Sequence, residues 1–190
     1  MSARKSGGRP ANEEASAALK AAALRLVREM GYENVSIAAI IAEAGVARQT
    51  LYNRWDTKAD LILEAIFEAT NSYAAEPALD SAQDYRAQLE DFLVEVFEHL
   101  KVDGATIRSL IASSQKDAKF HASFHAKFVL PREQMMTLML RRAQDHGALS
   151  PARNVEVMST MIHGAFWYRL LNREVLDATL AQEIVAETFA

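Results

Sequence analysis

The sequence predicts an all-α protein with about nine helices, divided into a small N-terminal domain and a larger C-terminal domain. Apolar residues recur at spacings of three and four along most of the 190-residue chain, the period of a helix with one buried face. Glycine and proline are sparse, at 7 and 4 residues, and no segment alternates as a half-buried β-strand does. We expect a flexible basic arm over residues 1–11, a three-helix domain over residues 12–60 and a helical domain over residues 61–190.

The composition is that of a folded protein without cysteine chemistry. Half of the residues are hydrophobic and 24% are charged, a balance typical of a packed globule. The absence of cysteine excludes disulfides, thiolate metal sites and a cysteine nucleophile. The N-terminus lacks the apolar core of a secretory signal, and no apolar run approaches the roughly 18 residues of a membrane-spanning helix. We therefore expect a soluble, intracellular protein that does not bind membranes.

The charge is distributed unevenly along the chain. The net charge is -4, which at first argues against nucleic acid as a partner. Residues 1–60, however, contain nine Lys or Arg against seven Asp or Glu, whereas the rest of the chain contains twelve against eighteen. A mildly basic N-terminal part thus precedes an acidic body, and only the former favours phosphate binding.

The N-terminal domain carries the signals of three helices. Asn12 is a suitable N-cap for the first helix, and Gly31 ends it. Ser36 caps the second helix, and Gly45 supplies the flexible backbone for a sharp turn into the third, over residues 47–55. The second and third helices together have the layout of a helix-turn-helix motif.

The third predicted helix is more polar than packing alone explains. Its six polar residues are Arg48, Gln49, Thr50, Tyr52, Asn53 and Arg54. In a helix-turn-helix, Arg, Gln and Asn pair with base edges in the major groove, while Thr, Tyr and Lys hold phosphates. Leu51 and Trp55 face inward. A DNA-reading helix is the favoured interpretation, with an ordinary polar surface helix as the alternative.

The C-terminal domain begins with a long fourth helix from Leu61 that ends before Pro77. The fifth helix is expected over residues 81–102. Gly104 breaks the pattern before a short sixth helix at residues 107–111.

Proline marks the next two helix boundaries. Pro131 interrupts a helical stretch over residues 117–146 and should kink or split it. We hypothesise that the chain bends there when a ligand enters. Ser150 followed by Pro151 predicts the start of the eighth helix, and Asp177 is the expected cap of the ninth.

The last two predicted helices have apolar residues on more than one side. One core cannot use all of this surface, so we expect a homodimer interface there. The expected interface residues are Met158, Met161, Ala165, Leu180, Ile184 and Val185.

A family resemblance adds to this reading. The motifs that carry it are Ile40-Ile41-Ala42, Ala44-Gly45-Val46, Thr50-Leu51-Tyr52, Trp55, Lys58 and Leu61. Over residues 12–66 the chain resembles the DNA-binding domain of the tetracycline-repressor (TetR/AcrR) family of bacterial transcription regulators. The match beyond is weaker, in Arg141-Arg142-Ala143 and in Tyr168-Arg169-Leu170-Leu171.

The resemblance implies an Ω-shaped homodimer that binds a palindromic operator and is released by a small-molecule effector. It implies that the protein is a cytoplasmic bacterial repressor, associated with the nucleoid when bound to DNA. Arg48, Gln49 and Asn53 are then the candidates for base contacts. The candidates for phosphate contacts are Ser36, Thr50, Tyr52, Arg54 and Lys58, joined by Arg9 of the basic arm, which could also reach the minor groove. Ala47 departs from the family pattern, because Ser or Thr usually caps the third helix.

The sequence names a possible ligand pocket in the C-terminal domain but no ligand. Each candidate is an apolar or aromatic residue, with one histidine, that could equally be core. They are Phe67, Tyr73, Phe92, Phe97, Phe120, Phe124, Phe128, Met135, His163, Phe166 and Trp167.

No cofactor, metal or catalytic residue is predicted. His121 and His125 share a helix face at a spacing that suits a metal, but two ligands do not make a site. The motifs of metalloproteases, α/β-hydrolases and phosphate-binding loops are absent from the sequence. Two alternatives stay open: a DNA-binding protein without an effector, and a helical small-molecule-binding protein or enzyme.

Overall fold

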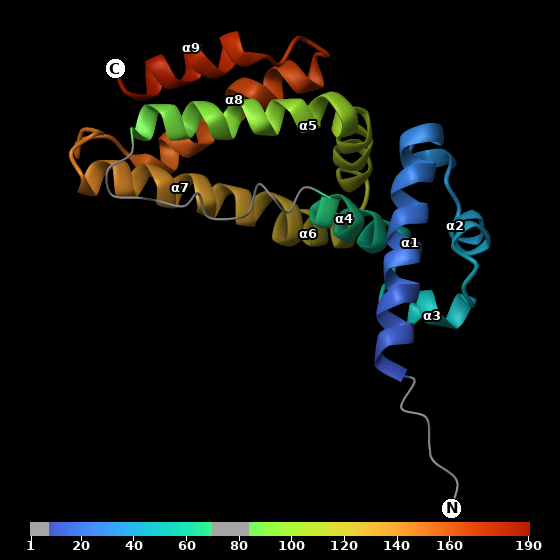
Figure 1. The fold of residues 1–190 in the computed structure, drawn as a ribbon. Coiled ribbons are helices and arrows are strands. Elements are labelled where there is room, and N and C mark those ends of the chain that lie inside the picture. The colour runs from blue at the N-terminus through green and yellow to red at the C-terminus, as the bar shows by residue number, and fades with distance from the viewer. Residues whose placement is uncertain (1–7, 70–83) are drawn as a thin grey trace, which may run out of the picture.

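A computed structural model describes residues 8–69 and 84–190, and within these two ranges the regular structure is entirely helical (Figure 1). The predicted all-α class is therefore confirmed. The helices fall into two groups, which meet at α4. None of the described helices has the length and apolar character needed to cross a membrane.

The first group is a small unit, called the head below. It consists of α1 (Gly8–Met30), the short 3-10 turn η1 (Tyr32–Asn34), α2 (Ile37–Ala44) and α3 (Arg48–Tyr52). α1 packs against α2, α3 and α4 around a fully buried core. Its members include Leu19, Ala23, Ile40, Leu51 and Trp55.

The start of α1 differs from the prediction. The helix begins at Gly8, so Asn12 is an exposed residue inside it rather than its N-cap. Arg9, which the prediction placed in the basic arm, lies in the first turn of α1. Residues 1–7 lie outside the described part of the chain.

The second group, called the body below, consists of five helices and one wide turn. They are α5 (Tyr85–Ser114), α6 (Ala118–Phe124), the π-helical turn η3 (His125–Val129), α7 (Leu130–Asp145), α8 (Val155–Leu171) and α9 (Ala178–Thr188). Figure 1 shows α9, α5 and α7 as successive layers, while α1 runs across their direction at one end. α4 (Lys58–Ala69) joins head to body and contacts α6 and η3.

Gly104 does not end a helix, contrary to the prediction. α5 continues through it to Ser114, so the separate short helix at residues 107–111 does not exist. A Cβ on Gly104 would lie 2.9 Å from Cδ1 of Leu170, which packs against it from α8. Position 104 is therefore glycine because α8 packs closely against it. The sequence pattern that predicted a helix break reflects this packing.

Pro131 splits the predicted long helix, and it does so through a wide turn. It occupies the first turn of α7, directly after η3. A proline cannot donate a backbone hydrogen bond, so the preceding turn opens to a π-helical one. The start of α8 was predicted wrongly: Asn154, not Ser150, is its cap and accepts from Val157 N at 3.0 Å. The predicted cap of α9, Asp177, is confirmed.

Candidate DNA-binding head and effector cavity

The turn between α2 and α3 has the geometry that the sequence predicts. Ser36 Oγ accepts a hydrogen bond from the backbone N–H of Ala39 at 3.1 Å and so caps α2. Gly45 has φ of 64°, in the left-handed region that side chains disfavour, and its N–H donates to the carbonyl of Ile41. This fixed turn sets the direction in which α3 leaves α2.

α3 is held by two apolar anchors and exposes a polar face. Leu51 is fully buried and Trp55 is 2% exposed, so the helix cannot rotate about its axis without breaking the core. The remaining positions form what is called the reading face below, which consists of the exposed residues Arg48, Gln49, Tyr52 and Asn53. Thr50 is half-buried beside it. Ala47, the residue before α3, offers no side-chain cap, as its sequence implies.

The side chains of the reading face are paired with one another. Gln49 Nε2 donates to Asn53 Oδ1 at 2.8 Å, and the guanidinium carbon of Arg48 lies 5.5 Å from the centroid of the Tyr52 ring. These are contacts along one exposed helix face, which water or base edges can replace at little cost. The hydrogen-bond donors and acceptors of the reading face are therefore not needed to hold the protein core together.

Arg54 has a different environment from the reading face. Its guanidinium donates to Ser16 Oγ and to Glu64 Oε1, both at 3.0 Å, while Trp55 Nε1 donates to Glu64 Oε2 at 2.8 Å. Burial alone would raise the pKa of Glu64, but these hydrogen bonds outweigh it and lower the pKa. The phosphate contact of Arg54 stays a prediction, and it would use a guanidinium that already binds Ser16 of α1 and Glu64 of α4.

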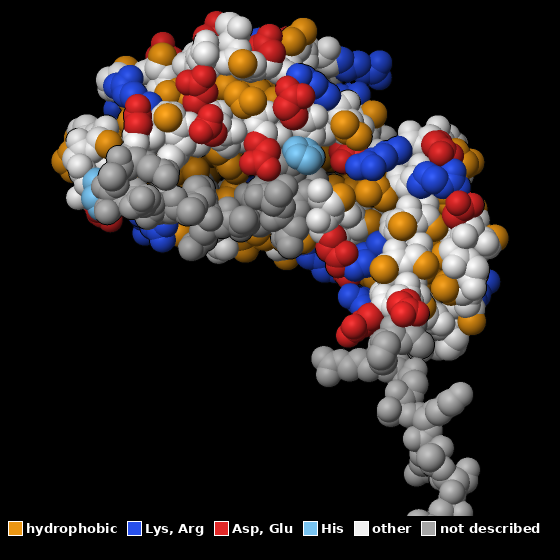
Figure 2. Space-filling view, viewed as in Figure 1, with side chains coloured by type: hydrophobic (Ala, Val, Ile, Leu, Met, Phe, Trp, Pro, Cys, Tyr) orange, Lys and Arg blue, Asp and Glu red, His pale blue; other side chains and the backbone are white. Residues whose placement is uncertain are grey.

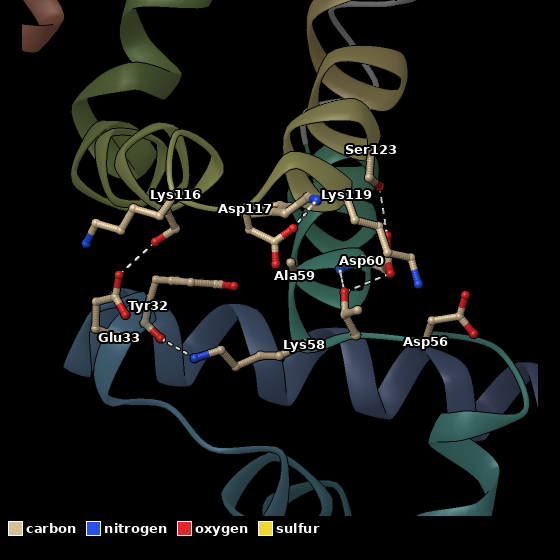
Figure 3. A pocket seen from close by; sticks show the side chains of 13 residues that line it. Tyr32, Glu33, Asp56, Lys58, Ala59, Asp60, Lys116, Asp117, Lys119 and Ser123 are labelled. Carbon is tan, nitrogen blue, oxygen red and sulfur yellow. Dashed lines mark hydrogen bonds between the residues drawn. The ribbon is translucent and has the colours of Figure 1, made fainter.

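Lys58 closes the junction between η1 and α4. Its Nζ donates to the backbone carbonyls of Tyr32 at 2.7 Å and Val35 at 2.9 Å, and lies 4.2 Å from the centroid of the Tyr32 ring (Figure 3). Burial lowers the pKa of Lys58, because desolvation disfavours the ammonium, and Glu33 partly opposes this. No sequence pattern predicted this internal role of Lys58. An ammonium has three donors, so a phosphate contact stays a prediction for the third.

An open pocket of about 640 Å³ separates the head from the body at this junction (Figure 3). Asp60 of α4 lines this pocket and binds the body, because its Oδ1 accepts hydrogen bonds from Ser123 Oγ at 2.8 Å and from Lys127 Nζ at 3.0 Å. Ser113 Oγ donates to Glu33 Oε1 at 2.7 Å on the other side. Polar contacts thus join head and body at several points around the pocket.

The body encloses a small cavity, called the inner cavity below, between α5, α7 and α8. Its volume is about 50 Å³. The structure brings together six of the residues predicted for a pocket: Phe92, Phe128, Met135, His163, Phe166 and Trp167. Sequence reasoning missed six others: Val96, His99, Leu100, Asp103, Ile107 and Arg132. Five of these missed residues lie on α5 with the helical period of Phe92, and three of the five are apolar.

The other residues predicted for the pocket lie elsewhere. Phe97 and Phe124 are buried against neighbouring rings, with Phe97 5.9 Å from Phe166 and Phe124 5.0 Å from Phe128 between centroids. Phe67 faces the guanidinium of Arg132 from α4. Phe120 lines the pocket between head and body instead of the inner cavity. Tyr73 lies outside the described residues.

A partly buried ion pair links the inner cavity to the head. Asp103, whose side chain is 2% exposed, lines the cavity and accepts two hydrogen bonds from Arg28 of α1, at 2.6 and 2.8 Å. This bidentate geometry is the strong form of a carboxylate–guanidinium contact. The pKa of Arg28 is raised by the bond to Asp103. A residue of the cavity wall is therefore attached directly to a helix that supports α3.

Both histidines of the inner cavity are shifted toward the neutral form. Burial lowers the pKa of His163, although the bond between its Nδ1 and the carbonyl of Ser159, at 2.8 Å, works in the opposite direction. Burial also lowers the pKa of His99, against the attraction of Asp103. Because both imidazoles are neutral at pH 7, the charged groups of the cavity wall are the carboxylate of Asp103 and the guanidinium of Arg132.

α8 and α9 form a shallow groove of about 260 Å³, lined by four of the residues predicted for the dimer interface: Met158, Met161, Ala165 and Ile184. Met161 is 68% exposed, and Val157, Tyr168 and Leu171 extend the exposed apolar surface along α8. Leu180 and Val185 lie outside the groove and are buried within the protomer, as are Met158 and Ile184, so Met161 is the exposed member of the predicted set. The interface itself stays a prediction.

His121 and His125 are exposed on α6 and η3. Among the described residues, no cluster of three or more His, Asp or Glu is placed to hold a metal ion. The metal alternative therefore gains no support from the placement of these two side chains.

Comparison with known proteins agrees with the division into head and body. Residues 19–65 match the family model of bacterial regulatory proteins of the tetR family, and residues 80–188 match that of the tetracyclin repressor-like C-terminal domain. An uncharacterized HTH-type transcriptional regulator of Bacillus subtilis (strain 168), YdeS, is 29% identical over 96% of this chain and 91% of its own. Another, Rv1556 of Mycobacterium tuberculosis (strain ATCC 25618 / H37Rv), is 28% identical over 80% and 73%.

Solved structures share the whole architecture. The TetR family transcription regulator SCO0332 superposes with a TM-score of 0.75 at 26% identity, covering 92% of this chain and 96% of its own. The regulator FadR from Bacillus subtilis, in complex with stearoyl-CoA, has the same fold with a TM-score of 0.75 at 15% identity, over 92% and 97%.

Head, reading face and body together define a helix-turn-helix DNA-binding regulator of transcription, not an enzyme. The chain belongs to the TetR family of bacterial transcription regulators.

Proposed function

We propose that this regulator is a repressor that binds a palindromic operator as a homodimer and leaves it when a small molecule occupies the inner cavity. The observation that carries the proposal is the Arg28–Asp103 ion pair, because it joins the cavity wall to the head by two hydrogen bonds. A ligand that moves Asp103 would act directly on α1, and through its packing on α3. The protein would act in the bacterial cytoplasm.

The homodimer would form through α8 and α9. The exposed apolar side chains of α8 and the groove beside α9 offer the kind of self-complementary surface that a twofold interface uses. Two heads related by this axis would read half-sites about one helical turn apart, or a multiple of it. The likeness in fold to a regulator that binds stearoyl-CoA supports a ligand-binding role for the body.

Fluorescence anisotropy with DNA from the protein's own upstream region tests the proposal. Binding should be saturable, should select a palindromic segment over random DNA and should weaken steeply as salt rises. Adding small molecules should release the DNA, whereas a regulator without an effector would stay bound with every compound. A protein that shows no preference for any DNA segment would contradict the proposal at its first step.

A further inference from the structure

Two hollows meet at the seam between η3–α7 and α8. The inner cavity lies on one side, and an open groove of about 350 Å³, called the outer groove below, lies on the other. Four side chains line both of them: Phe128, Arg132, His163 and Trp167. These four side chains therefore form the partition that separates the cavity from the surface.

Arg132 is the charged member of this partition. Its guanidinium carbon lies 3.8 Å from the centroid of the Phe128 ring and 5.7 Å from that of Phe67, and Nη1 donates to the carbonyl of Phe128 at 2.9 Å. Burial lowers the pKa of Arg132 to about 10, because its surroundings disfavour the charged form. At neutral pH the side chain is still protonated, so it brings a positive charge into a partition whose other three side chains are aromatic rings.

The other polar groups that line the inner cavity are not expected to attract a cationic ligand. Asp103 is engaged by two hydrogen bonds from Arg28, and the lowered pKa values of His99 and His163 keep both rings neutral at pH 7. Glu133 lines the outer groove but not the inner cavity. A ligand in the cavity would therefore meet a positive charge from Arg132 within an apolar setting, where electrostatic attraction is strong.

The sizes of the two hollows indicate how a ligand would enter. Sites for small organic ligands measure about 300–1,000 Å³, so the inner cavity alone is too small and the outer groove is not. Rotation of the Phe128 and Trp167 side chains would join the two. Gly164 lines the groove on the α8 side, and a Cβ there would meet nothing within 4 Å, so the approach is open at this point.

We propose that the effector is an organic anion, a carboxylate on an aromatic or aliphatic body, which enters from the outer groove and pairs its carboxylate with Arg132. A guanidinium and a carboxylate form a charge-assisted, often bidentate contact. The apolar body of the ligand would pack against Phe92, Phe166 and the displaced ring of Trp167. This inference rests on the proposed function, since it names the chemical class of the effector.

Isothermal titration of the full chain with a matched pair of probes tests the class of ligand. The probes are phenylalkanoates with two to eight methylenes and their neutral amides, which differ only in the charged group. We expect the best carboxylate to bind at least about tenfold more tightly than its amide. Arg132→Met should remove this preference, whereas Arg141→Met, on the exposed face of the same helix, should keep it.

Fluorescence locates the bound probe. The chain has two tryptophans, so a Trp55→Phe background leaves Trp167 as the sole reporter. Its emission should change on titration with the carboxylate, at concentrations that match the calorimetric binding curve. A saturating calorimetric signal with unchanged Trp167 emission would place the probe elsewhere and would overturn the proposal.

Three further results would overturn it: equal binding of acid and amide, absence of binding by either series, or an acid preference that survives in Arg132→Met. If Arg132→Met fails to fold, the comparison of acid with amide on the wild-type chain still decides. Operator release is scored separately. A carboxylate that binds through Arg132 but leaves the protein on DNA would refute the proposed induction while the ligand class stands.

Discussion

At the scale of single residues, the reading face separates two kinds of DNA contact. Arg48 has a side chain suited to the edge of guanine, whereas Tyr52 has a single hydroxyl suited to a phosphate. Both are exposed on α3 and lie against one another, so neither is needed for the core. Truncating either one should leave the head folded.

Replacing these two residues should therefore give different losses. Tyr52→Phe should weaken binding to all DNA sequences by a similar factor, because only a phosphate contact is removed. Arg48→Ala should change the preferred base at one operator position, at a cost of about 1–3 kcal/mol for the preferred sequence. Selection from a randomised operator library measures both. Identical preferences in wild type and Arg48→Ala would contradict the role given to Arg48.

Asp60 should make the folded protein less stable at acid pH. Burial alone would raise the pKa of Asp60, but hydrogen bonds from Thr57, Ser123 and Lys127 outweigh it and the pKa is lowered. A group with a lowered folded pKa adds stability above its ordinary pKa, near 3.9, and loses it as pH falls through the lower folded value. The loss should thus occur below about pH 4.

Thermal denaturation as a function of pH measures this contribution. Asp60→Asn should lower the melting temperature at pH 7, and the difference from wild type should shrink as the pH falls below about 4. Asp56→Asn, which changes an exposed carboxylate four residues earlier, is the matched control and should have little effect. A pH-independent difference for Asp60→Asn would show that the carboxylate's charge is not what matters.

At the scale of helices, the ends that local sequence decides could be predicted and the ends that packing decides could not. Ser36 and Asp177 cap α2 and α9 as expected, because a cap needs only the next three residues. Gly104 was misread as a break, since the reason for it is Leu170, which is 66 positions away along the chain. Gly8 lies four residues before Asn12, the expected N-cap, so the helix start was also wrong.

The inner cavity shows the same limit. Its aromatic residues could be predicted, because large apolar side chains on amphipathic helices are candidates for any pocket. Arg132 and Asp103 could not, because a charged residue on a helix is normally solvated. Only the folded arrangement shows that Asp103 meets Arg28, 75 residues away, and that Arg132 lies against two phenylalanine rings.

A side-chain N-cap, which α3 lacks, should stabilise this helix if it is introduced. Ala47 has the extended backbone of an N-cap, with φ of -73° and ψ of 144°, but no side-chain acceptor. Ala47→Ser should therefore raise the free energy of unfolding by about 0.5–2 kcal/mol, and Ser36→Ala should lower it by a similar amount at α2. Urea denaturation measures both. Ala47→Val, which cannot accept a hydrogen bond, is the control, and an equal gain from it would exclude capping as the cause.

At the scale of the whole molecule, head and body are joined by a few polar contacts and by α4. The Arg28–Asp103 pair is the most buried of these contacts on the α1 side, and Asp60 anchors the α4 side through Ser123 and Lys127. The orientation of the head therefore depends on side chains from α1 and α4 together. Removing one of these contacts should widen the range of orientations of the head relative to the body without unfolding either unit.

Arg28→Met should do this. Removing the guanidinium leaves the carboxylate of Asp103 without its bidentate partner, at a cost of about 1–3 kcal/mol, moderated because the Arg28 side chain is 38% exposed. The chain has no cysteine, so spin labels can be placed at Ala38→Cys in α2 and Ala148→Cys in the body. The distance distribution between them should broaden, and operator affinity should fall.

Arg25→Met is the matched control for this measurement. Arg25 lies on the same helix but pairs with Glu29 and Glu43, both within the head. Its loss should leave the distance distribution unchanged. If both variants broaden the distribution equally, the effect comes from α1 itself and not from the link to the body.

The π-helical turn η3 makes the chain sensitive to a change of one residue in length. An α-helix advances about 100° per residue, so deleting one residue from a wide turn would restore a regular helix and rotate α6 by about that angle relative to α7. Ser123 and Lys127, which hold Asp60, lie at the end of α6 and in η3. A single deletion there would turn them away from the head, which makes this turn a site where indels could retune the regulator while reading face and cavity keep their sequences.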